Sequence, residues 1–335
     1  MDTQTKSGKM AIFNQVGGPE VLLLTDIDVP APSSNEVRIL VKAIGLNRVD
    51  LSYRQGVYSK KPKFPSKIGF EAAGIVESIG SDVQHLSLGD EVSVIGAFSN
   101  DDYGTYGNLI LLPAYAVQKH PKRLSFQQAA GLWVSFLAAY GLLIDVGGLK
   151  KGQYVAINAA SGSTGLAIIQ MVKKIGGIPI AITTSSHKKK ALLDAGASHV
   201  IISSEQDITT ELLSITGNGV EIILDAVGGS QLEKLITATA AGGQLIVYGA
   251  LSREYSSWPT IEVLSKKLTI RGFDMTQLLI VKDKLKAAIE FINVGVNSGD
   301  LTPTIAKTFP LTKVSEAHQF MEDNNQVGKV ILEVD

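Results

Sequence analysis

The stretch that most constrains this 335-residue chain is a strand-like apolar run that ends in a turn of small residues and continues at once as a helix-like run. The apolar run begins at Tyr154, and the turn reads Ala-Ala-Ser-Gly-Ser-Thr-Gly over residues 159–165. A strand, a tight turn and a helix N-terminus together direct backbone N–H groups at a phosphate. The spacing from Ala160 through Gly162 to Gly165 keeps the dinucleotide-binding pattern G-x-G-x-x-G, with alanine at its first position. A turn formed only for packing is the alternative.

Strand-like and helix-like segments alternate from residue 153 onward. The strand candidates are Tyr154–Asn158, Ile178–Thr183, His199–Ile202, Glu221–Asp225, Gln244–Tyr248 and Thr269–Phe273. The helix candidates begin near Thr164, Ser186, Asp207 and Ser230, and a further one runs from about Val281 to Val294. This alternation predicts right-handed βαβ crossovers and a doubly wound parallel sheet.

The rest of the chain has a different pattern. Residues 9–120 read as short β segments separated by turn residues, and residues 302–335 return to short β runs. Such a pattern favours a small, mostly antiparallel barrel or sandwich. We therefore expect one domain from residues 1–130 with 302–335 and a second domain from residues 131–301.

The longest uncharged run extends from Leu124 to Ile144. Ser125 and Gln128 form the pattern of a capping box, which predicts that a helix begins there. We expect this helix to break near Gly131 and a buried helix to follow, rather than a membrane span.

Charge and composition exclude several classes of function. The formal net charge is −1, so neither nucleic acid nor an anionic membrane is expected as a partner. The absence of cysteine excludes disulfides, thiolate zinc ligands and a cysteine nucleophile. The polar first ten residues lack the apolar core of a signal peptide, so we expect a cytoplasmic protein.

Several motifs in a fixed order make the chain resemble the zinc-independent branch of the medium-chain dehydrogenase/reductase superfamily, and most of all its quinone oxidoreductase (zeta-crystallin-like) group. The resemblance covers about residues 10–333. Besides the turn at 159–165, it rests on Gly45–Asp50, Gln55–Tyr58, Gly69–Gly74, Gly89–Val92, Leu224–Gly229, Gly242–Ile246 and Gly328–Leu332. It implies an α/β fold in which a doubly wound parallel Rossmann sheet binds the cofactor and a mostly antiparallel GroES-like β domain supplies the catalytic and substrate residues.

Zinc is not expected. The zinc alcohol dehydrogenases of this superfamily have a cysteine ligand at the place of Asn47 and a histidine ligand at the place of Phe70, and neither residue here supplies thiolate or imidazole. The five histidines show no ligand spacing and are expected in loops or at the surface: His85, His120, His187, His199 and His318. Without a Lewis acid, hydride transfer to a quinone or an activated alkene is easier to explain than alcohol oxidation.

The residues after the second strand of the parallel sheet indicate NADPH. Folds that prefer NAD have an acid about 20 residues beyond the glycine turn. Here residues 183–190 read Thr-Thr-Ser-Ser-His-Lys-Lys-Lys, and the first acid is Asp194. Hydroxyl groups and an ammonium bind a 2′-phosphate, whereas an acid repels it. The resemblance puts Lys188 on the family's phosphate-binding lysine, with Ser185 beside it; a solvated helix face made of Lys188, Lys189 and Lys190 is the alternative.

The remaining cofactor candidates lie at the carboxyl ends of the strands, where open α/β sheets bind their ligands. The resemblance assigns the nicotinamide carboxamide to backbone groups there, and places Lys329 near the cofactor. The full set of expected cofactor contacts is Asn47, Ser161, Gly162, Ser163, Thr164, Gly165, Thr183, Thr184, Ser185, Lys188, Ala226, Val227, Tyr248, Gly249, Ala250, Phe273 and Lys329.

Two residues are candidates for catalysis. The amide of Asn47 can orient the nicotinamide ribose or hydrogen-bond a substrate carbonyl, with an ordinary turn asparagine as the alternative. Tyr58 matches, by its place in Gln-Gly-Val-Tyr, the tyrosine proposed as proton donor in related mitochondrial enoyl reductases. Tyr53, Trp133 and Phe136 are candidates for the acceptor pocket, although Trp133 and Phe136 also fit an ordinary core stripe.

The sequence thus predicts a soluble, zinc-independent, NADPH-dependent reductase that acts on a small quinone or α,β-unsaturated carbonyl. A first alternative is an enoyl-thioester (acyl-CoA or acyl-carrier-protein) reductase, for which Lys60, Lys61 and Lys63 offer a basic entrance. A second is a non-catalytic NADPH-binding or RNA-binding protein of zeta-crystallin type, which the balanced charge does not support. The resemblance also implies a homodimer joined through the last strand near Thr269–Phe273.

Overall fold

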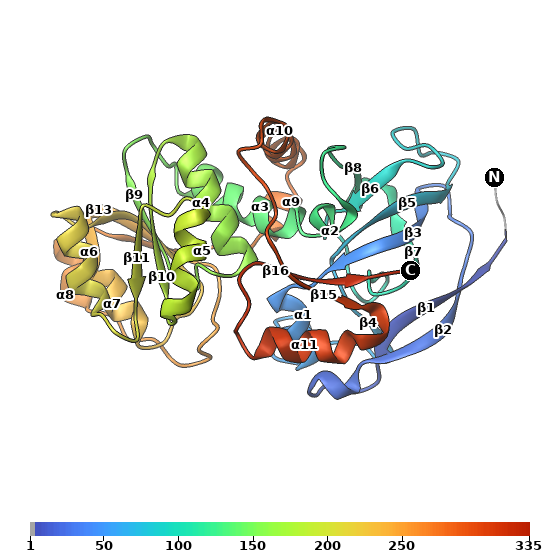
Figure 1. Ribbon diagram of the computed structural model, residues 1–335, viewed down its shortest axis with the longest axis horizontal. Coiled ribbons are helices and arrows are strands. Elements are labelled where there is room, and N and C mark those ends of the chain that lie inside the picture. Colours follow the sequence, from blue (N-terminus) through green and yellow to red (C-terminus); the bar gives the residue numbers. More distant parts are fainter. Residues whose placement is uncertain (1–3) are drawn as a thin grey trace. The chain divides into compact units, whose positions relative to one another are not determined.

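The computed structural model describes residues 4–335 and divides the chain into two compact units (Figure 1). Unit 1 consists of Met1–Val134 and Thr302–Asp335, and unit 2 consists of Ser135–Leu301. The sequence puts the first boundary a few residues earlier, at 130/131.

Unit 2 is built on a six-stranded parallel sheet in the order β11-β10-β9-β12-β13-β14. Its strands are β9 (Tyr154–Ile157), β10 (Ile178–Thr183), β11 (His199–Ile202), β12 (Val220–Asp225), β13 (Thr239–Val247) and β14 (Thr269–Gly272). The chain starts at the centre with β9, winds outward to β11, and then returns to build β12, β13 and β14 on the other side. The expected doubly wound parallel sheet is therefore confirmed, and its strand order reverses between β9 and β12.

Helices connect the strands of unit 2, and α4 and α5 pack beside β10 and β11 (Figure 1). The helices after the strand β9 are α4 (Ser163–Ile175), α5 (Lys189–Asp194), α6 (Ile208–Thr216), α7 (Gln231–Ala238), α8 (Thr260–Ser265), α9 (Thr276–Leu279) and α10 (Lys282–Ser298). The sheet is covered because its strands are almost continuous apolar runs, as expected for parallel strands buried on both faces. Ile180, Ile223 and Leu245 from three of these strands are fully buried in one cluster.

Unit 1 contains a seven-stranded sheet in the order β15-β16-β3-β5-β6-β8, with β7 also paired to β3, and a three-stranded sheet in the order β2-β1-β4. The strands are β1 (Lys6–Phe13), β2 (Leu23–Val29), β3 (Glu36–Gly45), β4 (Ser66–Lys67), β5 (Glu71–Ile79), β6 (Glu91–Val94), β7 (Leu109–Pro113), β8 (Val117–Lys119), β15 (Ile305–Pro310) and β16 (Lys329–Glu333). Their pairings are antiparallel except for β15 with β16. This confirms the mostly antiparallel domain.

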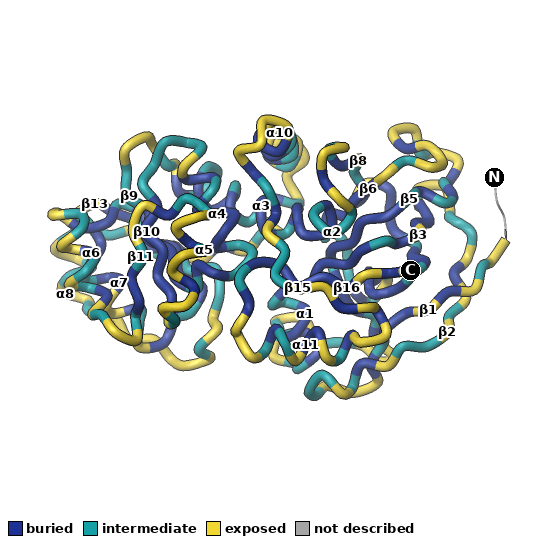
Figure 2. Tube along the Cα trace, viewed as in Figure 1, coloured by how far each residue is buried: buried dark blue, intermediate teal, exposed yellow. Residues whose placement is uncertain are grey.

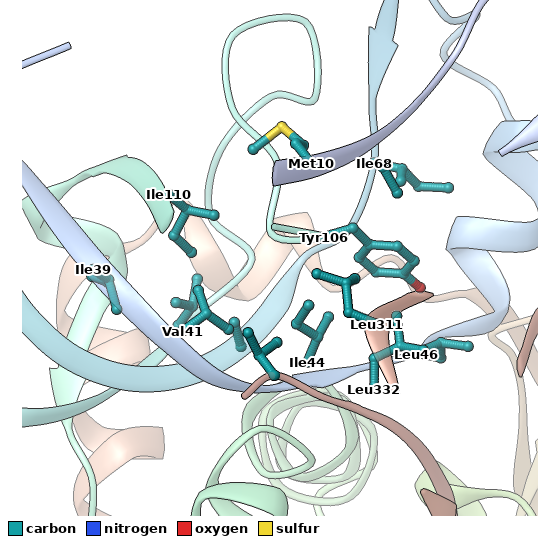
Figure 3. Packing of buried hydrophobic residues seen from close by; sticks show 14 of the residues in the cluster. Met10, Ile39, Val41, Ile44, Leu46, Ile68, Tyr106, Ile110, Leu311 and Leu332 are labelled. Atoms are coloured by element: carbon teal, nitrogen blue, oxygen red, sulfur yellow. The ribbon is translucent and has the colours of Figure 1, made fainter. Parts of the chain in front are cut away.

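The core of unit 1 fills the space between these strands (Figure 3). Ile39, Val41 and Ile44 come from β3, and Leu332 comes from β16 at the other end of the chain. Figure 2 shows the corresponding dark segments, with exposed positions concentrated in turns and on outer helix faces. The C-terminal segment thus completes the core of the N-terminal unit.

Two helices of unit 1 were not expected from the sequence. α1 (Arg48–Arg54) forms in the region where we expected short β segments separated by turns, and α11 (Val314–Glu322) forms where we expected short β runs. α11 buries Val314, Ala317 and Met321 against the unit 1 core, which is the spacing of one helix face. The short apolar runs on either side of α11 obscured this period.

The uncharged run at 124–144 forms three helical pieces, as the capping signal predicts in outline. α2 (Phe126–Ala129) begins after Ser125, whose Oγ accepts a hydrogen bond from the Gln128 N–H at 3.2 Å. α3 (Trp133–Tyr140) follows, and a π-helix over Gly141–Val146 continues it. Within the part of the chain that the structure describes, no helix is long and apolar enough to span a membrane.

Candidate functional site

The turn between β9 and α4 has the backbone features of a phosphate cradle. Ala159 has φ of 47°, a left-handed conformation that costs an alanine about 1–2 kcal/mol. A Cβ on Gly165 would lie 2.4 Å from the carbonyl oxygen of Ala160, so only glycine lets the helix approach the strand this closely. Gly162 is the N-cap of the 13-residue α4, and Ser163 begins its first turn, whose N–H groups have no partner inside the helix. The expected strand–turn–helix is therefore present, with Ser161 buried and Thr164 half-buried beside it.

The three neighbouring lysines that follow β10 differ in burial. Lys188 is 6% exposed, whereas Lys189 and Lys190 are exposed, and Lys190 forms an ion pair with Asp194 at 2.7 Å. Thr183 at the end of β10 is buried, Thr184 is exposed, and Ser185 precedes a 3₁₀ turn that ends at Lys188. Asp194, the first acid after Thr183 in the sequence, is thus paired with Lys190.

A buried carboxylate braces the point where the strand order reverses. Asp225, at the end of β12, accepts a hydrogen bond from the Asn158 side chain that follows β9. It also accepts from the Val227 and Gly228 N–H groups at 2.9 and 3.0 Å, while Asn158 Oδ1 accepts from the Ala226 N–H at 2.7 Å. These bonds fix the backbone of Ala226 and Val227. Asn158 was not among the predicted site residues, although a polar residue at the end of an apolar strand is a usable signal.

The ends of β13 and β14 carry the other expected cofactor residues. A Cβ on Gly249 would lie 2.6 Å from the Ala226 carbonyl oxygen, so the two strand ends approach as closely as glycine allows. Burial, together with the charge of Asp225, raises the pKa of Tyr248, so its hydroxyl stays protonated. A Cβ on Gly141 would lie 2.4 Å from the Phe273 ring, so this ring packs directly on the glycine. Ala250 is exposed. The carboxyl ends of β12 and β13 therefore lie close together at one edge of the sheet.

In unit 1, both members of a buried ion pair contact the side-chain amide of Asn47. Lys329 Nζ and Glu71 Oε2 form a salt bridge in which both residues are 1% exposed. Lys329 Nζ also donates to Asn47 Oδ1 at 2.7 Å, and Asn47 Nδ2 donates to Glu71 Oε2 at 3.1 Å. Glu71 Oε1 accepts from the Val134 N–H at 2.7 Å. Among the described residues, Asn47 and Lys329 are thus in direct contact, and Glu71 is a third member that the sequence analysis missed.

A chain of hydrogen bonds extends from Asn47 to α11. The Asn47 N–H and the Tyr106 hydroxyl both donate to Asp50 Oδ2, at 2.8 and 3.0 Å. Tyr106 Oη lies 3.2 Å from His318 Nε2, and His318 Nδ1 lies 3.1 Å from Arg54 Nη1. Because arginine only donates, Nδ1 accepts and Nε2 carries the proton, so every bond in the chain points toward Asp50.

Burial controls the ionisation of the side chains in this hydrogen-bonded series. It raises the pKa of Asp50 to about 7, against the hydrogen bonds from Asn47 and Tyr106 that lower it. Burial, with the Arg54 charge, lowers the pKa of His318 to about 3, so this histidine is neutral at pH 7. Asp50 Oδ1 is buried without a hydrogen-bond partner among residues 4–335, which leaves it as the place for a proton.

The expectation that all five histidines lie in loops or at the surface was wrong, and the lysines of the expected basic entrance have partners that the sequence did not indicate. His120 and His318 are buried, at 6% and 0% exposure, instead of lying at the surface, because neutral imidazoles pack in a core when burial lowers their pKa. The lysines of the proposed basic entrance are engaged within unit 1. Lys60 and Lys63 pair with Asp101 at 3.0 and 3.2 Å, and Lys61 donates to the Gly56 carbonyl oxygen.

The aromatic candidates for the acceptor pocket are mostly enclosed. Tyr53, Trp133 and Phe136 are at most 2% exposed; the Tyr53 hydroxyl lies 3.1 Å from Ser66 Oγ, and Trp133 Nε1 donates to Ser93 Oγ at 2.8 Å. Tyr58 is half-buried against the unit 1 core. Tyr58 thus keeps part of its surface accessible, which the other three do not.

No group of three or more His, Cys, Asp or Glu side chains in the described residues is arranged to hold a metal ion. The described fold combines a parallel sheet carrying a phosphate-type turn with a mostly antiparallel β unit, which defines the class of two-domain nicotinamide-dependent oxidoreductases.

Comparisons with known proteins agree with this class. Residues 33–122 match the family model of the alcohol dehydrogenase GroES-like domain, and residues 195–332 match that of the zinc-binding dehydrogenase. The quinone oxidoreductase of Homo sapiens is 31% identical over 95% of this chain and 95% of its own length. The chain belongs to the quinone oxidoreductase group of the medium-chain dehydrogenase/reductase superfamily, and it is an oxidoreductase.

Two solved structures match over nearly the whole chain. The Escherichia coli quinone oxidoreductase complexed with NADPH is 28% identical with a TM-score of 0.89, covering 98% of this chain and 100% of that one. A structure described as an NAD-dependent alcohol dehydrogenase is 29% identical, also with a TM-score of 0.89 and coverage of 98% and 100%. Since proteins described with either cofactor share the fold, the choice of cofactor depends on individual side chains.

Proposed function

We propose that this enzyme transfers hydride from NADPH to a quinone or an α,β-unsaturated carbonyl without zinc. The observation that carries the choice of NADPH is the buried Lys188, which follows Thr183 and Ser185 at a strand end where NAD-preferring folds have an acid. A lysine with little exposure has lost most of its conformational freedom, so its contact with a 2′-phosphate costs less entropy than that of a mobile surface lysine. The exposed Lys189 and Lys190 lack this advantage.

The residues of unit 2 fit the rest of a nicotinamide dinucleotide. The first turn of α4 offers N–H groups to the pyrophosphate, and Gly165 keeps that turn close to the strand. The backbone of Tyr248, Gly249 and Phe273 would hold the carboxamide. When bound, NADPH supplies a hydride from C4 of its nicotinamide, and the protein's task is to orient that carbon and exclude water.

Zinc does not fit the donor set around Asn47. The amide oxygen of Asn47 and the carboxylate of Glu71 both contact the ammonium of Lys329, so a cation already occupies their electrostatic environment. A divalent metal at the same oxygens would meet strong like-charge repulsion in a site closed to water. Phe70 offers no ligand atom. We therefore assign the reaction to the cofactor and polar side chains alone.

Proton supply differs between the two classes of acceptor. Reduction of an activated alkene needs a proton at the carbon next to the one that receives hydride, and Tyr58, with its partly accessible side chain, is our candidate donor. A quinone is protonated on oxygen, which water can do. The enoyl-thioester alternative stays open, because the Lys63 side chain remains 80% exposed although Lys60 and Lys63 both pair with Asp101.

The test combines an acceptor panel with a cofactor comparison. Purified enzyme is mixed with NADPH or NADH and with quinones and enones of increasing size. Lys188→Ala should raise the KM for NADPH about tenfold to a hundredfold, because one charge-assisted contact is lost, and change the KM for NADH less than about twofold. Lys190→Ala, which removes an exposed lysine paired with Asp194, is the matched control. Tight NADPH binding without oxidation by any acceptor would refute the reductase, and stoichiometric zinc in the active enzyme would refute the metal-free reaction.

A homodimer is part of the proposal. β14 is the last strand of the six-stranded sheet, and α8, which precedes it, carries Ile261 and Leu264 at 82% and 72% exposure. Trp258 just before α8 is 54% exposed. Exposed large apolar side chains beside a sheet edge favour pairing with a second copy.

A further inference from the structure

The π-helix at Gly141–Val146 is fixed at both ends to the last two strands of the parallel sheet. At its first residue, a Cβ on Gly141 would lie 2.4 and 2.7 Å from Cζ and Cε2 of Phe273, the residue after β14. At its other end, Gln244 Nε2 of β13 donates to the Gly147 carbonyl oxygen at 3.0 Å. π-Helical turns are rare and occur often at functional sites. The contact between Gly141 and Phe273 thus joins such a turn to the end of a strand.

The backbone of Phe273 is held independently of its ring. Its N–H donates to the Val247 carbonyl oxygen at 2.8 Å, which extends the pairing of β13 with β14 by one residue. The next residue, Asp274, accepts from the Thr276 N–H at 2.8 Å in the turn that precedes α9. Phe273 is 8% exposed. Because the main chain is held on both sides, the ring can change its place only by turning about this fixed backbone.

Only a residue without a side chain fits at position 141 while the ring keeps its place. Non-bonded carbon atoms pack at about 3.5–4.0 Å, and a Cβ at this position would be much closer than that to two ring carbons. Glycine is also a weak helix former, so helix propensity does not explain its place in the continuous helical run of α3 and the π-helix. The contact with the Phe273 ring does explain it.

We propose that Gly141 is a positioning residue for the nicotinamide: it keeps the Phe273 ring against the π-helix, so that the backbone at the ends of β13 and β14 stays open to the carboxamide. The inference rests on the proposed function, in which the backbone of Tyr248, Gly249 and Phe273 holds that group. A side chain at position 141 would displace the ring, and the ring would turn about one of the residues that bind the carboxamide. Residue 141 therefore controls binding of the nicotinamide half of the cofactor and leaves binding of the adenosine half unchanged.

A comparison of two ligands tests this role. NADPH carries the nicotinamide, whereas adenosine 2′,5′-bisphosphate carries the adenine and the 2′-phosphate without it. In calorimetric titrations, Gly141→Ala should weaken binding of NADPH about tenfold or more and change binding of adenosine 2′,5′-bisphosphate less than about twofold. Val146→Ile adds a methyl group at a half-buried position of the same π-helix; it is the matched control and should alter neither. Equal weakening of both ligands, or unchanged binding of NADPH, would overturn the inference.

Rescue by a second substitution separates positioning from a general effect on packing. Leucine lacks the Cε and Cζ atoms that a Cβ at position 141 would meet, so Gly141→Ala/Phe273→Leu should bind NADPH within about threefold of the wild type. A folded double variant that binds NADPH as weakly as Gly141→Ala would overturn the inference.

A change on the ring itself gives the same test with glycine in place. Phe273→Tyr adds a hydroxyl to Cζ, the ring atom nearest to a Cβ on Gly141, and should reproduce the selective loss of NADPH binding. This variant also serves if Gly141→Ala does not fold. Phe273→Tyr that binds both ligands as the wild type does would contradict the proposed contact.

The wild-type measurements separate this inference from the proposed function. If the wild type binds NADPH but reduces no quinone or enone, the reductase is refuted, and a selective loss with Gly141→Ala still confirms the inference. If an active wild type is accompanied by equal losses with both ligands, the inference alone is refuted. If the wild type binds no NADPH, both are refuted.

Discussion

The buried carboxyl of Asp50 makes the stability of unit 1 depend on pH in an unusual direction. Its pKa is about 7 in the folded protein against 3.8 for an aspartate in water, and Tyr106 and the Asn47 N–H donate to its Oδ2. Between these two values the folded state binds more protons than the unfolded state, so stability falls as pH rises from about 4 to about 7. The difference of about 3 pKa units corresponds to about 4 kcal/mol, of which about 3 kcal/mol falls between pH 4.5 and 8.

Asp50→Asn removes this titration and leaves an oxygen to accept from Tyr106 and Asn47. The free energy of unfolding of the variant, minus that of the wild type, should therefore rise by about 3 kcal/mol from pH 4.5 to pH 8. The constant part of the difference, from packing and hydrogen bonding, cancels in this comparison.

Urea unfolding measured by tryptophan fluorescence provides the assay. The chain has two tryptophans, and Trp258→Phe leaves the fully buried Trp133 of unit 1 as the reporter. Tyr106→Phe is an informative companion: losing its hydrogen bond raises the pKa of Asp50 further, so the fall in stability should extend to higher pH. A difference between Asp50→Asn and wild type that stays constant within about 1 kcal/mol from pH 4.5 to 8 would refute the buried titration.

Three further predictions address the cofactor turn, the proton donor and the assembly. Gly165→Ala places a Cβ 2.4 Å from the Ala160 oxygen, so it should destabilise the protein by about 1–3 kcal/mol and weaken NADPH binding, measured by calorimetric unfolding and fluorescence titration; unchanged values would contradict the close approach. Tyr58→Phe should lower kcat for enones about a hundredfold and for quinones less than threefold in stopped-flow assays, and equal losses would argue against proton donation. Ile261→Glu should convert a dimer to a monomer in sedimentation experiments, while a wild type that is already monomeric would remove the assembly proposal.

The parallel sheet was the part of the fold most accessible from sequence. Strand ranges such as Ile178–Thr183 and His199–Ile202 agree with β10 and β11 because buried parallel strands are short, almost continuous apolar runs. The turn at 159–165 was recognisable because its small residues serve local backbone geometry. The helices α1 and α11 were missed because short amphipathic segments among β runs carry a weak period.

Some features of the candidate site follow from the sequence, and others depend on the tertiary structure. The sequence by itself determined the phosphate-type turn, the missing acid after Thr183 and the loss of thiolate and imidazole at Asn47 and Phe70, because these follow from residue type and local spacing. Only the tertiary structure distinguished Lys188 from the exposed Lys189 and Lys190, since burial depends on neighbours that local spacing does not specify.

The environment of Asn47 is the clearest case of a tertiary decision. Lys329 lies 282 residues away in the sequence and Glu71 lies 24 away, yet both contact the same amide. The C-terminal strand β16 pairs with β3 and carries Lys329 to this place, where burial makes each charge require the other. The sequence supplied the amide, and the fold determined which charged side chains hold it.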